Sequence, residues 1–151
     1  MAFRFVIWLR AIVSLLSVQF LLGIWVNLFG SVPSTTSVVK ALEYTGDPEL
    51  TAHMLLAVVV VVLGFVIAVA SFGREPIPRL RSMTVGGLVS VLWSYEWGFQ
   101  FILSGYSSGT DSFWMAVGFI AAMAFYGVAQ TAVGPSEGER SAGPTGSKSA
   151  S

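Results

Sequence analysis

The chain has 151 residues, of which 54% are hydrophobic and 11% are charged, and its formal net charge is zero. An average soluble domain carries about 25% charged residues, so this composition indicates a membrane protein. The absence of a net positive charge gives no support for nucleic-acid binding. The sequence contains no cysteine, which excludes disulfides, thiolate metal sites, thiol nucleophiles and covalently attached haem.

Four long apolar segments follow one another, at about residues 11–30, 52–71, 83–104 and 113–133. Each approaches the roughly 20 residues that an α-helix needs to cross the hydrocarbon core of a bilayer. Because backbone groups in lipid must be hydrogen-bonded within the protein, we expect all four segments to be helices. The short connections predict an all-α fold, an integral membrane antiparallel four-helix bundle that occupies residues 1–133.

The first segment carries Gln19, Gly23 and Asn27 at intervals of four residues. Residues four apart share one face of a helix, and we expect this face to look into the bundle. Hydrogen bonding between helices, which stabilises by roughly 0.6–2 kcal/mol per contact, is the favoured interpretation of Gln19 and Asn27. The alternative is that both residues line a polar pocket.

The second segment opens with the only histidine of the chain, His53, one turn after Glu49. Their spacing places both residues on one helix face, at the outer mouth of the bundle, where the carboxylate could orient the imidazole for metal or haem ligation or tune its protonation. An interfacial histidine stabilised by a neighbouring acid is the simpler interpretation. One histidine without any cysteine argues against a zinc site.

The third segment contains Glu96 and Gln100 four residues apart, with Trp97 next to Glu96. A carboxylate at membrane depth is costly when it is charged and unpaired, so it normally faces a partner or a polar cavity. We therefore expect Glu96, Gln100 and Trp97 to face the bundle interior. They would form one outward-opening pocket with residues of the first two segments: Gln19, Asn27, Glu49 and His53. Hydrogen bonding between helices is the favoured role for Gln100, whereas ligand or proton binding and a structural role are equally open for Glu96.

Two pairs of short segments resemble each other within the chain. Ser17–Phe20 can be aligned with Ser94–Trp97, and Thr51–Met54 with Ser112–Met115. Many membrane proteins contain internal structural repeats, so one interpretation is a bundle of two duplicated helical hairpins. Chance similarity between apolar segments is the alternative.

Basic residues are distributed unevenly over the connections. Seven would lie on one side of the membrane: Arg4, Arg10, Arg74, Arg79, Arg81, Arg140 and Lys148. The opposite side would carry Lys40 and acidic residues. The positive-inside rule then predicts a multi-pass protein of the cell membrane with both termini in the cytoplasm. Residues 134–151, rich in Gly, Ser and Pro, are expected to form a disordered cytoplasmic tail.

A family resemblance rests on Val18–Asn27 (VQFLLGIWVN), followed by a segment that opens on Glu49 and runs on as His53–Ala57 (HMLLA). These motifs resemble one half of the haem A synthase family, some archaeal members of which are half-length, four-helix proteins. The resemblance implies haem ligands near the outer ends of the second and fourth helices. His53 matches the first position, whereas Trp114 or Met115 replaces the histidine at the second. A haem held by the axial pair His53 and Met115 is chemically possible.

Three functions are compatible with this pattern. The favoured one is a non-enzymatic accessory or assembly subunit of a larger membrane complex, such as a respiratory complex, with haem at His53 as an open question. The second is a haem-modifying or quinone-reactive membrane enzyme similar to haem A synthase. The third is a small proton-coupled transporter that acts as an oligomer, with Glu96 as the coupling site. The expected partners are the lipid bilayer and either other membrane subunits or further copies of the chain.

Overall fold

The described residues of the computed structural model are 2–29, 40, 48–73, 78–105 and 107–133. They contain four long helices: α1 (Ala2–Phe29), α3 (Pro48–Phe72), α4 (Pro78–Leu103) and α5 (Gly109–Ala132). The described residues include no strand, which confirms the all-α prediction. The expected tail, residues 134–151, lies outside the described residues.

Local sequence explains where the helices begin and end. α3 and α4 each begin at a proline, whose fixed φ angle and missing N–H suit the first position of a helix. Ser108 caps α5, and its side chain accepts a hydrogen bond from the backbone N–H of Asp111 at 3.3 Å. α4 ends just before Gly105, which has a φ angle of 65° that glycine adopts without steric cost.

Among the described residues, three helices are long and apolar enough to cross a membrane: Phe5–Phe29 within α1, Pro48–Phe72 and Gly109–Ala132. α4 is as long as the others, but its lower apolar content, with Glu96 and Gln100 in its second half, separates it from this group. Large apolar side chains on the three apolar helices point outward, including Leu21 (65% exposed), Leu55 (64%) and Ile120 (62%). An outward apolar surface of this kind indicates a membrane protein.

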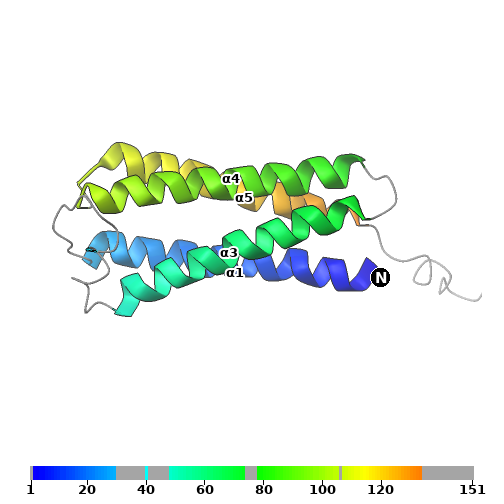
Figure 1. Cartoon of the computed structure of the whole chain (residues 1–151), viewed down its shortest axis with the longest axis horizontal. Coiled ribbons are helices and arrows are strands. Elements are labelled where there is room, and N and C mark those ends of the chain that lie inside the picture. The colour runs from blue at the N-terminus through cyan, green and yellow to red at the C-terminus, as the bar shows by residue number, and fades with distance from the viewer. Residues whose placement is uncertain (1, 30–39, 41–47, 74–77, 106, 134–151) are drawn as a thin grey trace, which may run out of the picture.

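The helices lie side by side along the long axis of the molecule (Figure 1). α1 contacts α3 and α5, and α4 contacts the same two helices, so the four contacts form a closed ring. The larger core cluster surrounds Leu9, Ile12, Ile67 and Tyr126, whose side chains are completely buried. A smaller cluster of Val26, Leu50 and Ile102 lies toward the opposite end of the helices.

Glycines allow the helices to approach closely in the larger core. A Cβ atom on Gly87 of α4 would lie 2.7 Å from Cζ of Tyr126, and a Cβ atom on Gly64 of α3 would lie 2.9 Å from the hydroxyl oxygen of the same tyrosine. On α5, a Cβ atom on Gly118 would lie 2.9 Å from the backbone nitrogen of Ser94. Small residues at such positions are typical of helix packing in membranes, where close backbone approach supplies van der Waals contact.

We predict that Gly87→Ala destabilises the protein whereas Gly127→Ala, also in a helix, does not. The new methyl group at position 87 would overlap the Tyr126 ring, at a cost of about 1–3 kcal/mol. No side chain lies within 4 Å of the corresponding position on Gly127, so alanine there gains only its better helix propensity, up to about 1 kcal/mol. Thermal unfolding in detergent measures both; equal melting temperatures for the two variants would contradict the packing role of Gly87.

Candidate functional site

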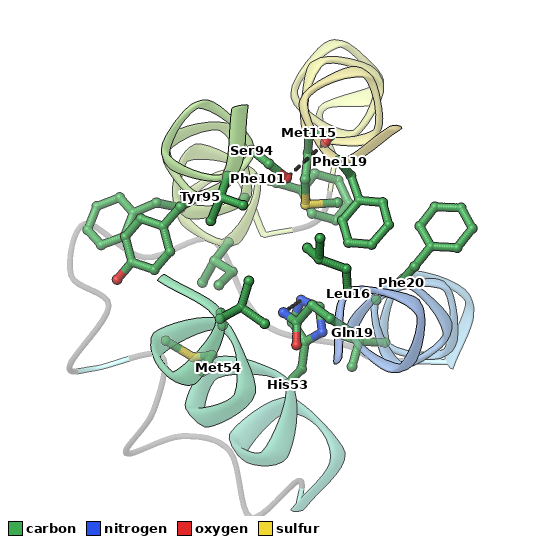
Figure 2. A pocket seen from close by; sticks show the side chains of 18 of the residues that line it. Leu16, Gln19, Phe20, His53, Met54, Ser94, Tyr95, Phe101, Met115 and Phe119 are labelled. Carbon is green, nitrogen blue, oxygen red and sulfur yellow. Dashed lines mark hydrogen bonds between the residues drawn. The ribbon is translucent and has the colours of Figure 1, made fainter. Parts of the chain in front are cut away.

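A cavity of about 600 Å³ lies between the four helices and borders the larger core. Five residues belong to both the core and the cavity lining: Leu16, Val60, Val91, Phe119 and Ala122. The C-terminal halves of α1 and α4 and the N-terminal halves of α3 and α5 enclose it (Figure 2). Its volume falls within the range of about 300–1,000 Å³ that small-molecule sites occupy. We refer to it as the interhelical cavity.

The lining of the interhelical cavity is mostly apolar. Among the described residues that line it, none is Asp, Glu, Lys or Arg. The lining residues that carry polar side-chain groups are Gln19, Asn27, Thr51, His53, Ser94, Tyr95 and Ser112. A predominantly apolar cleft with a few polar groups is the usual composition of a ligand site.

Gln19 of α1 and His53 of α3 form the main polar contact in this lining. The side-chain amide of Gln19 donates from Nε2 to Nε2 of His53 at 3.3 Å, slightly beyond the usual range for such a hydrogen bond. Gly23, one turn after Gln19, provides the space for the imidazole, because a Cβ atom there would lie 3.0 Å from Cε1 of His53. The sequence therefore places a glycine where α1 must accommodate the histidine ring.

Two atoms of this pair have no hydrogen-bond partner among the described residues. They are Oε1 of Gln19 and Nδ1 of His53, and both are buried. Gln19 as a whole is only 9% exposed. Leaving a buried donor or acceptor unpaired costs about 1–3 kcal/mol per group, so the pair is held at the expense of stability.

Met115 of α5 lines the same cavity as His53, and the two side chains reach it from different helices (Figure 2). Gly98 of α4 leaves room for the thioether, since a Cβ atom there would lie 3.2 Å from the sulfur. The hydroxyl of Ser94 donates to the backbone carbonyl of Met115 at 2.9 Å and joins α4 to α5 beside the cavity. Both candidate haem ligands, His53 and Met115, thus line one cavity. Within the described part of the chain, no three His, Cys, Asp or Glu side chains cluster as a metal site would require.

The remaining predicted pocket residues do not all reach this cavity. Asn27 lines it near the end of α1 and is exposed. Glu49 is exposed in the first turn of α3 and does not line it. Glu96, Trp97 and Gln100 line a separate surface cavity of about 290 Å³.

The predicted residues therefore line two separate cavities and not the single pocket expected from the sequence. Gln100 donates from Nε2 to Oε1 of Glu96 at 3.0 Å, so the two residues share a helix face as their spacing predicts, but that face is exposed. The face of α4 that lines the interhelical cavity carries Ser94, Tyr95 and Gly98 instead. Spacing within one helix shows which residues share a face and does not show which face turns inward, and this is why the prediction failed.

Several contributors to the site carried no clear signal in the sequence. Asp111, at the start of α5, completes the smaller cavity beside Glu96. Phe20 and Phe119 both line the interhelical cavity and stack with ring centroids 5.1 Å apart. The signal that could have located the cavity is a glycine facing a bulky residue of another helix. Gly23 lies opposite His53, and Gly98 lies opposite Met115.

Comparisons with known proteins found no matching family model, no similar curated protein and no similar solved structure. The resemblance to haem A synthase thus stays a prediction that rests on short motifs.

We predict that the double variant Gln19→Leu/His53→Leu is at least as stable as the wild type when the cavity is empty. Replacing both partners of a buried polar pair by apolar groups of similar size removes the unpaired atoms together. His53→Leu alone leaves the whole Gln19 amide unpaired and should lower the free energy of unfolding by about 1–3 kcal/mol. Equilibrium unfolding of the single and double variants in detergent measures this cycle, and a double variant less stable than either single variant would contradict it.

Proposed function

We propose that the protein is an integral membrane binding protein that holds a lipid-soluble ligand in the interhelical cavity and acts as a non-enzymatic accessory subunit of a larger membrane complex. Its four helices would cross the cell membrane as an antiparallel bundle with both termini in the cytoplasm. The observation that carries this proposal is the apolar interhelical cavity, whose Gln19–His53 pair retains two unpaired polar atoms.

The packing of α4 supports a four-helix arrangement across the membrane. α4 contacts both α3 and α5, which are apolar enough to span, and Ser71 of α3 accepts a hydrogen bond from the hydroxyl of Thr84 at 3.0 Å in the buried interface. A helix joined to two spanning helices along its length shares their depth. Its lower hydropathy is then explained by its polar surface near one end, around Glu96.

The chemistry of the cavity favours binding over catalysis. Its polar groups serve hydrogen bonds: His53 accepts from Gln19, and the Ser94 hydroxyl donates to a backbone carbonyl. A nucleophilic mechanism would place a hydroxyl within hydrogen-bond reach of a base, and Ser94 points at the Met115 carbonyl instead. A polar pair that costs stability in the empty protein is expected where a ligand completes it.

The surface around the smaller cavity supports a subunit role. Glu96 and Gln100 are exposed on a helix that packs among apolar helices, and Trp93, Trp97 and Trp114 form a cluster beside them with ring centroids 5.9–6.4 Å apart. Exposed carboxylate and amide groups near membrane depth are stabilised by a protein partner more readily than by lipid. The proton-coupled carrier receives less support, because Glu96 does not line the interhelical cavity.

A haem held by His53 and Met115 is the second candidate, because both side chains line one cavity from facing helices. Paired His and Met ligands are known for haem iron, and bundles build cofactor sites from side chains on facing helices. The Cε1 edge of the His53 ring lies against Gly23, and its Nδ1 has no hydrogen-bond partner among the described residues.

We predict that the protein purified in mild detergent retains a bound small molecule and that Ala116→Phe abolishes this retention. Ala116 lines the interhelical cavity, and a benzyl group there would fill part of its volume. Ala124→Phe, on an exposed position of the same helix, is the matched control and should retain the ligand. Native mass spectrometry measures the mass of the bound ligand. It also tests the subunit role, which predicts an assembly heavier than the 16.1 kDa of one chain. Equal occupancy in the two variants would contradict the cavity as the binding site, and a bare monomer would contradict the subunit role.

The haem candidate predicts a Soret absorption band in the purified protein. His53→Ala should abolish the band, and Met115→Leu should shift it by changing the second axial ligand. Met54→Leu, a cavity-lining methionine on α3, is the control and should leave the spectrum unchanged. A colourless wild type after expression with added haem precursor would rule out this candidate while leaving the binding of another ligand open.

A further inference from the structure

We infer that the ligand of the interhelical cavity is a lipid-soluble hydroquinone, whose free hydroxyl is recognised by Gln19 and His53 and whose ring and tail occupy the apolar lining. The inference rests on the proposed function, because it names the ligand class for the same cavity.

The cavity reaches the outward faces of the helices, which indicates entry from the bilayer. Its lining includes Val58 (51% exposed) of α3 and both Tyr95 (44%) and Phe99 (36%) of α4. On α1 it includes Phe20 (39%). A lining residue that is also exposed marks a place where the cavity meets the surface, and these surfaces face hydrocarbon in a membrane-embedded bundle. A ligand that enters this way must dissolve in lipid.

The lining favours an uncharged molecule that carries a ring. With no Asp, Glu, Lys or Arg among the described lining residues, a charged head group would lose its hydration without gaining an ion pair. The stacked rings of Phe20 and Phe119 provide an aromatic wall, and Phe101 adds another ring to the lining. Aromatic rings pack favourably against one another in offset or edge-to-face arrangements.

The Gln19–His53 pair offers one donor and one acceptor in either orientation of its groups. With Nε2 of Gln19 donating, the neutral imidazole carries its proton on Nδ1, and the unpaired atoms are a donor on His53 and the acceptor Oε1 on Gln19. With the amide turned by half a rotation, His53 donates from Nε2, and the unpaired atoms are an acceptor on His53 and a donor on Gln19. The terminal torsion of glutamine is broad, so this turn is easily made.

A hydroxyl group matches this pair better than a carbonyl group does. A phenolic hydroxyl both donates and accepts, so it can replace the long 3.3 Å contact and bond to Gln19 and His53 together once the two side chains move apart. A quinone carbonyl only accepts, and it would leave the acceptor of the pair unsatisfied. The cavity should therefore discriminate against quinones and against ethers of the same shape.

The test measures binding of three probes to the full chain in phosphatidylcholine nanodiscs by equilibrium dialysis, with empty nanodiscs correcting for partition into lipid. The probes are a short-tailed hydroquinone kept reduced under anaerobic conditions, its dimethyl ether and its quinone. We expect the hydroquinone to bind about tenfold more tightly than either, which corresponds to one satisfied hydrogen bond. Gln19→Leu should reduce this preference to less than about threefold, while Gln100→Leu, on the exposed face of α4, should leave it intact.

The outcomes separate this inference from the proposed function. Equal affinity for all three probes, with binding lost in Ala116→Phe, would overturn the hydroquinone assignment and leave the cavity as a ligand site. No binding of any probe, together with no retained ligand in the purified protein, would overturn both. A preference for hydroquinone that persists in Gln19→Leu would overturn the role of the polar pair. The comparison of probes on the wild type stands even where Gln19→Leu does not fold, and Gln19→Met is then the replacement variant.

Discussion

Glycines that leave room for side chains of neighbouring helices shape both halves of this molecule. The outward faces of the helices are apolar and gain little from burial in a lipid environment, so association depends on packing and on hydrogen bonds between helices. In one half, Gly64 and Gly87 close around the ring of Tyr126 and produce a dense core. In the other half, the spaces beside Gly23 and Gly98 are taken by His53 and Met115, which come from the neighbouring helices. Glycines opposite bulky side chains thus allow dense packing in the core and position the side chains that line the cavity.

Both halves contain buried polar groups. In the dense half, the hydroxyl of Thr84 donates to that of Ser71, which donates to the backbone carbonyl of Ala68, whereas the buried hydroxyl of Tyr126 has no hydrogen-bond partner among the described residues. Beside the cavity, the Gln19–His53 contact is long, and one buried atom of each partner has no hydrogen-bond partner among the described residues. Two apolar residues would serve packing better at this position. The cost is consistent with a group held ready for a ligand, because Gln19 and His53, unlike Tyr126, line a cavity.

The helices could be predicted from the sequence because apolar runs of about 20 residues leave few alternatives in lipid. The pairing of Glu96 with Gln100 could also be predicted, since it depends on spacing within one helix. Which face of α4 turns inward could not, because helix rotation is set by contacts with α3 and α5. Gly118 of α5 illustrates this. A Cβ atom there would lie 3.0 Å from the backbone oxygen of Ser90 and 2.9 Å from the backbone nitrogen of Ser94. Because Gly118 packs against the backbone of α4 at Ser90 and Ser94, the Ser94 side chain points toward Met115 and Glu96 lies on the surface.

The separation of Glu96 from His53 alters what the two residues can do. In a shared pocket, a carboxylate beside the imidazole would have favoured a charged ligand or proton transfer. In the structure, His53 shares its cavity with uncharged groups, so its hydrogen-bonding capacity is available to a neutral molecule from the bilayer. Glu96 lies instead with Gln100 and Asp111 at the surface, next to three tryptophans, where a protein partner could supply a complementary group. The proposed ligand site and the proposed partner surface then occupy different faces of α4, so each can be altered without disturbing the other.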